Sequence, residues 1–486
     1  MSGVPSVRVV AWCAALLLIM VFPCLGSAQS GLIDPSLIEV MSIRNIGPAN
    51  LGGRIHDVEV HPDHPATIWV GHAAGGVFRS VNNGTTWEAV FDDQVSTSIG
   101  DIAIAPANPS IVYVGTGEQN NRQSSSWGNG MYKTMDGGVT WQHIGLENTH
   151  HIGKIKVHPA DPDIVWVAAV GHLWGPNDER GVFMTTDGGA TWTKTLFINE
   201  DTGVIDIAVD TESPNILYAA AYQRRRTGFG FNGGGPHGGI YRSTDSGRTW
   251  QKLTKGLPTG EVGRIGLDIC LSDTDVVYAI IESRDTAENH VVGGQEQERA
   301  SLGGVYRSDD KGETWTHQCV ENPRPMYYSH IRVDPNNDLR VWVLDTQIYV
   351  SEDGAITWDT GFVGGIHVDH HALWWDPSDS DHIIVGNDGG LDWTYDGGET
   401  WVDMQTVPWS QFYEISADNV EPFYHVMGGL QDNGTWYGNS GNYWRIGITN
   451  RDWMTINGGD GFYAVADPVD PDIVYAESQG GGRESA

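Results

Sequence analysis

Apolar and polar residues alternate along short stretches of this chain, and the same order of stretches returns about every 50 residues. In one unit, an alternating run at residues 102–106 ends in a proline, an apolar run follows at 111–115, and a third run covers 131–134. Short runs of this kind are typical of β-strands. A fourth run begins at Trp141. Four strands in about 50 residues predict one blade of a β-propeller.

Each unit contains the same motif, Ser/Thr-x-Asp-x-Gly-x-Thr-Trp, immediately before its fourth run. The copies occur at residues 80–87, 134–141, 185–192, 243–250, 308–315, 351–358 and 394–401, with Asn82 replacing Asp in the first and Ala355 replacing Gly in the sixth. An Asp in a tight turn accepts hydrogen bonds from nearby backbone N–H groups, and Gly permits a positive φ. We therefore interpret the motif aspartates as structural; they are Asp136, Asp187, Asp245, Asp310, Asp353 and Asp396.

The repeats predict an all-β chain whose residues 52–405 form a propeller of about seven four-stranded blades. Residues 29–51 form an N-terminal segment in which 41–46 could supply a ring-closing outer strand. In residues 406–486 the pattern continues without a motif, with strands expected at 412–417, 425–429, 443–447, 461–467 and 473–477. We interpret this part as incomplete further blades of a truncated sequence, either the start of a second propeller or part of a ring of ten blades.

The first 28 residues have the pattern of a secretory signal peptide. Arg8 provides a positive charge, residues 9–25 are without charge and largely apolar, and Gly26-Ser27-Ala28 provides a cleavage site. An uncleaved anchor is the alternative. We therefore expect an exported protein, periplasmic or extracellular. No later stretch approaches the ~18 apolar residues of a membrane span.

The net charge limits the possible binding partners, and the positions of the cysteines limit the possible disulfide bonds. The chain has 28 basic and 62 acidic residues, a net charge of −34, so binding to nucleic acid through a basic face is not expected. Its apolar content of 40% excludes intrinsic disorder. Cys270 and Cys319, which follow the predicted leader, fall on the innermost and outermost strands of one blade. We expect both to be free and buried, since those strands are too far apart for a disulfide.

The repeat motif resembles the Asp-box, or BNR, repeat of sialidases, xyloglucanases, sortilin-type receptor domains and photosystem II assembly factors. The wider pattern is similar to large secreted bacterial BNR-repeat proteins that are described as sortilin-like or glycosyl-hydrolase-like. This resemblance implies a β-propeller in which the motif is part of the scaffold. It leaves the function open, because proteins with these repeats differ in what they do.

The catalytic residues of these families are not retained in an obvious way. The sialidases have a Phe-Arg-Ile-Pro segment, which this sequence lacks. The xyloglucanases place one Asp two residues before a Gly-Gly pair, where this chain has Ala73. Their second Asp lies in a Gly-Asp-x-Gly-Gly segment, where this chain has Asn387, with Asp388 one position late. Both differences argue against xyloglucanase chemistry of the usual form.

Long loops on the side of the blades opposite the motif turns are candidate binding segments. They occupy residues 117–128, 172–180, 224–237 and 283–302. Their aromatic, acidic and arginine side chains suit a sugar ring or a peptide, although such loops also occur as surface decoration. The candidate ligand-binding residues are Glu118, Arg122, Trp127, Trp174, Arg225 and His237.

The densest group of chemically active residues lies at 365–371. Strand alternation would place His367, Asp369 and His371 on one face, a set that suits Zn²⁺ or another transition metal. A hydrogen-bonded polar plug at the ring axis is the alternative. The carboxylates expected near that axis could include a general acid and base; they are Asp369, Asp388, Asp432 and Asp460.

Three functions remain open from the sequence. The first is an exported β-propeller that binds a glycan or peptide through its long-loop side and needs no cofactor. The second is a xyloglucanase-like glycoside hydrolase that uses the axial carboxylates. The third is a metal-dependent enzyme that uses the His367 group.

Overall fold

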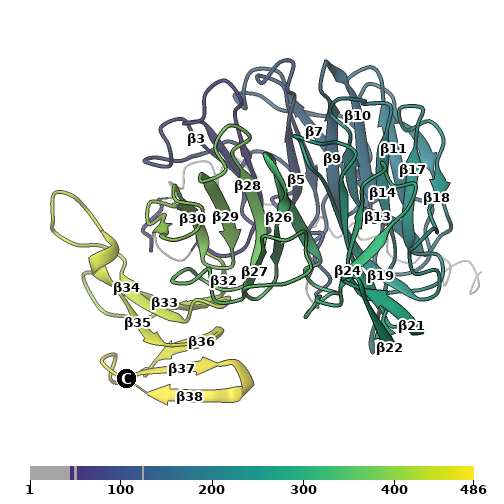
Figure 1. Cartoon of the computed structure of the whole chain (residues 1–486). Coiled ribbons are helices and arrows are strands. Elements are labelled where there is room, and N and C mark those ends of the chain that lie inside the picture. Colours follow the sequence, from purple (N-terminus) through teal and green to yellow (C-terminus); the bar gives the residue numbers. More distant parts are fainter. Residues whose placement is uncertain (1–43, 49–51, 123–124, 486) are drawn as a thin grey trace, which may run out of the picture. The chain divides into compact units, whose positions relative to one another are not determined.

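The computed structural model describes residues 44–48, 52–122 and 125–485. The predicted signal peptide and the residues up to 43 lie outside the described residues. Contacts divide the chain into Met1–Asn45, of which only Arg44 and Asn45 are described, and Ile46–Ala486. The regular structure of the second unit consists of β-strands and short 3₁₀ helices (Figure 1), as the alternating pattern predicts.

Consecutive strands pair antiparallel to form nine sheets of three or four strands in the described chain. The first four sheets contain β1 (Ile55–Val60), β2 (Ile68–His72), β3 (Gly76–Ser80) and β4 (Glu88–Ala89); β5 (Ile99–Ile104), β6 (Val112–Thr116), β7 (Met131–Thr134) and β8 (Gln142–His143); β9 (Ile152–His158), β10 (Asp161–Ala169), β11 (Gly181–Thr185) and β12 (Thr193–Leu196); and β13 (Thr202–Val209), β14 (Leu217–Gln223), β17 (Gly239–Ser243) and β18 (Gln251–Lys252).

The other five contain β19 (Val262–Ile269), β20 (Val277–Ser283), β23 (Gly304–Ser308) and β24 (Thr316–Cys319); β25 (His330–Asp334), β26 (Asn337–Leu344) and β27 (Ile348–Ser351); β28 (His370–Trp375), β29 (Ile383–Asn387), β30 (Gly390–Thr394) and β31 (Val402–Asp403); β32 (Phe412–Ala417), β33 (His425–Leu430), β34 (Thr435–Asn439) and β35 (Trp453–Asn457); and β36 (Gly461–Ala466), β37 (Val474–Ser478) and β38 (Gly482–Ser485).

Shorter elements are inserted between these strands. The hairpins β15–β16 and β21–β22 interrupt the fourth and fifth sheets between their second and third strands, within the two longest predicted loops. Their bounds, and those of the 3₁₀ helices, are β15 (Arg225–Thr227), β16 (Gly230–Asn232), β21 (Thr286–Val292), β22 (Gln295–Ser301), η1 (Glu147–Thr149), η2 (Asn450–Asp452) and η3 (Gln479–Gly481).

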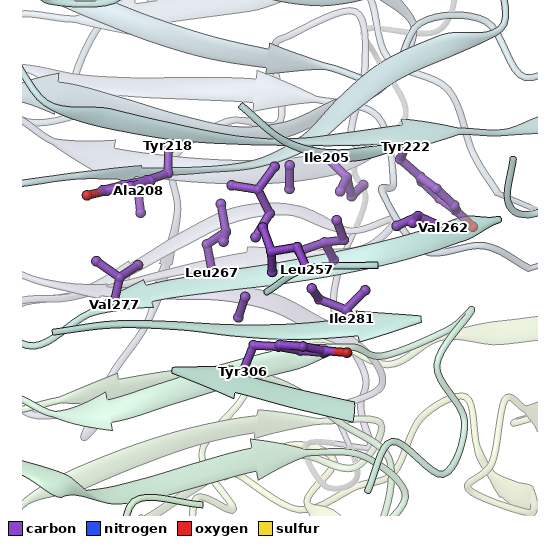
Figure 2. Close-up of a cluster of buried hydrophobic side chains, with 14 of the residues drawn as sticks. Ile205, Ala208, Tyr218, Tyr222, Leu257, Val262, Leu267, Val277, Ile281 and Tyr306 are labelled. Carbon is purple, nitrogen blue, oxygen red and sulfur yellow. The ribbon is translucent and has the colours of Figure 1, made fainter. Parts of the chain in front are cut away.

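The hydrophobic core lies between neighbouring sheets. In the cluster between the fourth and fifth sheets, Tyr218 of β14 and Leu267 of β19 are both buried (Figure 2). The first strands of the seven sheets up to β31 contact one another in chain order, and β28 also contacts β1, so these contacts form a cycle. Gly52 N–H donates to the Gly389 carbonyl oxygen at 2.6 Å where the first and seventh sheets meet.

The motif turns are built alike. In each of the six aspartate turns, the carboxylate accepts hydrogen bonds from the backbone N–H and the hydroxyl of the Thr four positions later. In the first turn the Asn82 amide replaces the carboxylate, accepting from Thr86 N–H and donating to its hydroxyl, both at 2.9 Å. The Trp side chains join successive sheets, as where Trp141 Nε1–H donates to the Val90 carbonyl oxygen at 2.7 Å.

Several local predictions are wrong. Residues 443–447 form no strand, and the exposed Tyr443 and Trp444 lie in the connection before β35. The third and fourth strands of that sheet are β34 and β35. Residues 44–46 form no ring-closing strand, and the rest of the predicted strand lies outside the described residues. The fourth strand of the seventh sheet is its own β31. The prediction of free, buried cysteines is confirmed for Cys270 and Cys319.

Candidate functional site

The candidate catalytic aspartates lie at the ends of the sheets opposite the motif turns. Asp388 lies in the turn between β29 and β30, and Asp432 lies in the turn between β33 and β34. Arg54 directly precedes β1 and Asp369 directly precedes β28. Because consecutive strands are antiparallel, second-to-third-strand turns and entries into first strands fall at the same end of a sheet.

Arg54 is the centre of a buried ionic network. Its Nε and Nη2 donate to the two carboxylate oxygens of Asp388 at 2.9 and 2.7 Å, and its Nη1 lies 3.1 Å from Glu118. Burial opposes the charge on Arg54, but Asp388 and Glu118 together raise its pKa well above the ordinary value. The network thus joins the first, second and seventh sheets through charge-assisted hydrogen bonds.

His371 extends this network as a neutral imidazole. Asn120 lies 3.0 Å from its Nδ1, and Asp388 lies 3.0 Å from its Nε2. The arrangement fits a tautomer in which Asn120 donates to Nδ1 and Nε2–H donates to Asp388. Burial, and then the positive charge of Arg54, lowers the pKa of His371 well below its ordinary range. The Asp388 carboxylate is therefore held by both Arg54 and His371, which are themselves buried.

Three carboxylates meet beside this network. One oxygen from each of Asp369, Asp388 and Asp432 lies within 4.8 Å of the other two. Asp460 is joined to them through a carboxylate oxygen that accepts the Asp432 backbone N–H at 2.8 Å. Burial raises the pKa values of Asp369, Asp432 and Asp460, and neighbouring carboxylates raise them further. Carboxylates this close favour a shared proton or a bound cation.

A polar chain connects this carboxylate group to the loop between β6 and β7. Gln431 Nε2 donates to Asp388 at 3.2 Å and to Asp432 at 2.9 Å, while its Oε1 accepts from Arg122 at 3.0 Å. Arg122 Nη1 in turn lies 4.0 Å from Glu118. The structure therefore brings two of the predicted ligand-binding residues together with the four predicted catalytic aspartates.

The other predicted ligand-binding residues lie elsewhere. Trp127 is 65% exposed, and its ring lies 5.6 Å from that of His150. Trp174 is also exposed and forms a backbone bridge with Arg226. Arg225 pairs with Asp201, and Asp201 and the exposed His237 line an open hollow of about 620 Å³.

The expected alternation at 367–371 is wrong. Strand β28 begins only at His370, and Asp369 has a left-handed φ of 67°. His367 Nδ1 lies 2.8 Å from the Val368 carbonyl oxygen, His371 pairs with Asp388, and Asp369 accepts from the Tyr328 hydroxyl. Among the described residues, the side chains grouped closely enough to hold an ion are Asp369, Asp388 and Asp432. Their oxygen-only donor set suits Ca²⁺ or Mg²⁺ better than a transition metal.

Sequence reasoning missed Arg54 and Tyr328. Arg54 belongs to no repeated motif. The sequence shows only that a charged residue directly precedes the strand that begins with Ile55. Tyr328 lies in a connection before β25, and nothing in its sequence neighbourhood links it to Asp369. In the described part of the chain, no helix is long and apolar enough to span a membrane.

Comparisons with known proteins agree with the repeat pattern. A Sortilin-Vps10 family model, described as "Sortilin, neurotensin receptor 3", matches residues 75–227. The oligoxyloglucan-reducing end-specific xyloglucanase of Emericella nidulans is 24% identical over 302 residues, which cover 53% of this chain and 35% of that protein. The chain thus spans about a third of that relative's length.

Solved structures show the same architecture. The GH74 xyloglucanase from Xanthomonas campestris superimposes with a TM-score of 0.58 at 15% identity, covering 91% of this chain and 73% of that one. PorZ, a surface component of the type-IX secretion system of Porphyromonas gingivalis, gives a TM-score of 0.51 at 13% identity, covering 90% and 51%. At these identities the likeness concerns the fold alone. The chain therefore carries BNR-type repeats of the Sortilin-Vps10 kind and is distantly related to the GH74 xyloglucanases.

Proposed function

We propose that this chain is an exported β-propeller protein that binds a glycan beside the carboxylate group formed by Asp369, Asp388, Asp432 and Asp460. In this proposal the sheets from β1 to β31 form one seven-bladed ring, and the sheets from β32 onward begin a second propeller. The observation that carries the proposal is the continuous polar chain from Arg122 through Gln431 to these carboxylates.

The chemistry of this surface favours a glycan over a peptide. Half-buried carboxylate oxygens and the Arg122 guanidinium match the donors and acceptors of sugar hydroxyl groups. The stacked rings of Tyr413 and Phe462, 5.2 Å apart, lie next to Asp460 and offer apolar area. The strongly negative chain opposes acidic peptides. Because xyloglucan-degrading enzymes are among the relatives, xyloglucan oligosaccharides are the first ligands to test.

Calorimetric titration of the purified chain with xyloglucan, cello- and manno-oligosaccharides tests this proposal. We expect at least one series to bind, and Asp432→Asn or Arg122→Met to weaken that binding at least tenfold. Asp472→Asn, an exposed change in the connection after β36, serves as the matched control and should bind as the unaltered chain does. Lack of binding to all three series, or equal binding by Asp432→Asn, would contradict the proposal. Cell fractionation tests the export.

Glycoside hydrolysis is a second candidate, favoured by the raised pKa values of Asp369, Asp432 and Asp460. A carboxylic acid that keeps its proton beside an ionised carboxylate is the pair that glycosidases need. In this candidate, Asp432 or Asp460 serves as the acid. Release of reducing ends from xyloglucan that is lost in Asp460→Asn, with binding retained, would favour hydrolysis. Binding without release under the same conditions would favour recognition alone.

A further inference from the structure

A small cavity lies among the first strands of the sheets, next to Gln119 of the β6–β7 loop. Its volume is about 10 Å³, which is enough for one water molecule or one small ion. Side chains from six of the seven repeat sheets line it, together with Gln119 of that loop. The charged and titratable lining residues are His56, Asp57, Lys154, Asp206, Arg264, Arg332, His330 and His371.

Arg264 is the unusual member of this lining. It is 1% exposed, yet its guanidinium forms no ion pair within 4.0 Å with any carboxylate of the described chain. Its Nη2 lies 3.4 Å from Gln119 Oε1 and 3.2 Å from His330 Nε2, both uncharged acceptors. Its Nη1 has no hydrogen-bond partner among the described residues. A buried guanidinium without a counter-charge carries a large desolvation cost.

Three other buried arginines have partners for both of their terminal nitrogens, although the Nε atoms of Arg180 and Arg224 have none among the described residues. Arg54 has Asp388 and Glu118, and Arg224 donates to the carbonyl oxygens of Gln119 and Asn120 at 3.0 and 2.9 Å. Arg180 donates to two carbonyl oxygens as well. Burial lowers the pKa of Arg264, as expected for a cation with no close anion, although Asp206 and Glu282 oppose that shift from a greater distance.

The two carboxylates in the lining are already engaged. Asp57 accepts the Ile102 backbone N–H at 2.9 Å and lies 3.6 Å from Lys154. Asp206 accepts the backbone N–H groups of Ile207 and Leu267, each at 2.9 Å. Backbone N–H groups therefore stabilise the negative charges of Asp57 and Asp206, whereas Arg264 has no charged partner within 4.0 Å among the described residues.

His56 provides a second donor with unused capacity. Both of its ring nitrogens are buried without a hydrogen-bond partner in the described chain. Glu118 Oε1 lies 3.8 Å from His56 Nε2, too far for a hydrogen bond. A neutral imidazole still has one N–H to donate.

We propose that this cavity binds one monovalent anion of chloride size, held by the Arg264 guanidinium with His56 as a further donor. The anion neutralises the buried Arg264 guanidinium, whose Nη1 has no partner among the described residues. It also stabilises the β6–β7 loop, because Gln119 shares both the cavity and Arg264. His371 borders this cavity and also contacts Asp388, but the anion site does not depend on the glycan proposal.

Thermal unfolding of the full chain at constant ionic strength tests the inference, with sodium gluconate replaced stepwise by sodium chloride or bromide. We expect the midpoint temperature to rise saturably with chloride and bromide. The rise should be lost in Arg264→Met and kept in Arg340→Met. Arg340 is the matched control, since it is mostly buried but lies 3.0 Å from Glu352. Equal midpoints in gluconate and chloride, or an unchanged chloride effect in Arg264→Met, would overturn the proposal.

A second measurement does not depend on whether the variant folds. Crystals of the unaltered protein grown in bromide should give one anomalous peak within hydrogen-bond distance of Arg264 Nη1. Density with no anomalous signal at that position would identify a water molecule instead and would overturn the anion assignment.

Discussion

Arg54 and Asp388, separated by 334 positions in the chain, form a two-point buried ion pair. Arg54 enters the first strand of the first sheet, and Asp388 lies in a turn of the seventh. The pair therefore connects the two ends of the repeated region, beside the backbone hydrogen bond from Gly52 to Gly389. Both side chains are 2% exposed, so neither charge has water to replace a lost partner.

Arg54→Met should lower the free energy of unfolding by about 3–5 kcal/mol, because it leaves Asp388 and Glu118 buried without their cation. Arg225→Met is the control: Arg225 and Asp201 are 34% and 41% exposed, and such a pair contributes at most about 1 kcal/mol. Urea unfolding of both variants at pH 7 measures the difference. Equal losses would mean that Arg54 contributes little beyond a surface pair.

Two substitutions of Asp353, in the sixth motif turn, test how much the turn hydrogen bonds contribute to stability. Asp353 accepts three hydrogen bonds at one carboxylate oxygen and one at the other. Asp353→Ala should cost about 1–3 kcal/mol of stability, because the turn loses charge-assisted bonds. Asp353→Asn should cost clearly less, since Asn82 already satisfies the same geometry in the first turn. Chemical unfolding of the two variants checks the order, and the reverse order would contradict this account of the motif.

The repeats could be predicted from the sequence because their signals are local. The alternation at 131–134 and 412–417 reproduces the bounds of β7 and β32, since each strand is bounded by turn residues a few positions away. The sequence also predicts that Asp369, Asp388 and Asp432 lie near one another, and the structure brings them together. The partners of these aspartates could not be predicted in the same way, because no local pattern pairs Arg54 with Asp388. The strand predicted at 367–371 does not form as expected, because Asp369 has a left-handed backbone conformation that its residue type does not reveal.

Acid should destabilise the fold through buried neutral histidines, of which His72 is the clearest. Gly52 O lies 3.0 Å from its Nε2, and its Nδ1 accepts the Ala74 backbone N–H at 3.1 Å. Burial lowers the pKa of His72 to about 4. The pKa of His72 in the folded state lies below its unfolded value of about 6.5. The stabilisation that neutral His72 gives the fold is therefore fully present above pH 6.5 and is lost as the pH falls towards 4.

The expected loss from His72 is roughly 3 kcal/mol between pH 7 and pH 4, at about 1.4 kcal/mol per pKa unit. Unfolding free energies measured across this range should fall for the unaltered chain and fall less steeply for His72→Gln. His64→Gln, an exposed change in the connection after β1, is the control and should keep the original slope. A His72→Gln slope identical to that of the unaltered chain would show that His72 does not contribute.

Asp392 should act in the opposite direction, destabilising the fold as the pH rises. This side chain of β30 is 4% exposed and faces Asp403 of β31 across the sheet. Burial raises its pKa to about 7, although Asn387 donates to it at 2.7 Å. The pKa of Asp392 in the folded state lies above its unfolded value of about 3.9. The stability that depends on a protonated Asp392 is therefore fully present below pH 4 and is lost as the pH rises from 4 to 7.

Asp392→Asn should therefore stabilise the protein at pH 8, by roughly 2–4 kcal/mol, and have little effect near pH 4. The new amide oxygen can still accept the Asn387 hydrogen bond, so the variant removes the buried charge without removing an acceptor. Asp403→Asn, which neutralises the exposed carboxylate opposite, should give a much smaller gain. Unfolding free energies of the three proteins between pH 4 and 8 provide the test. A variant less stable than the unaltered chain at pH 8 would mean that ionised Asp392 contributes to stability through Asn387.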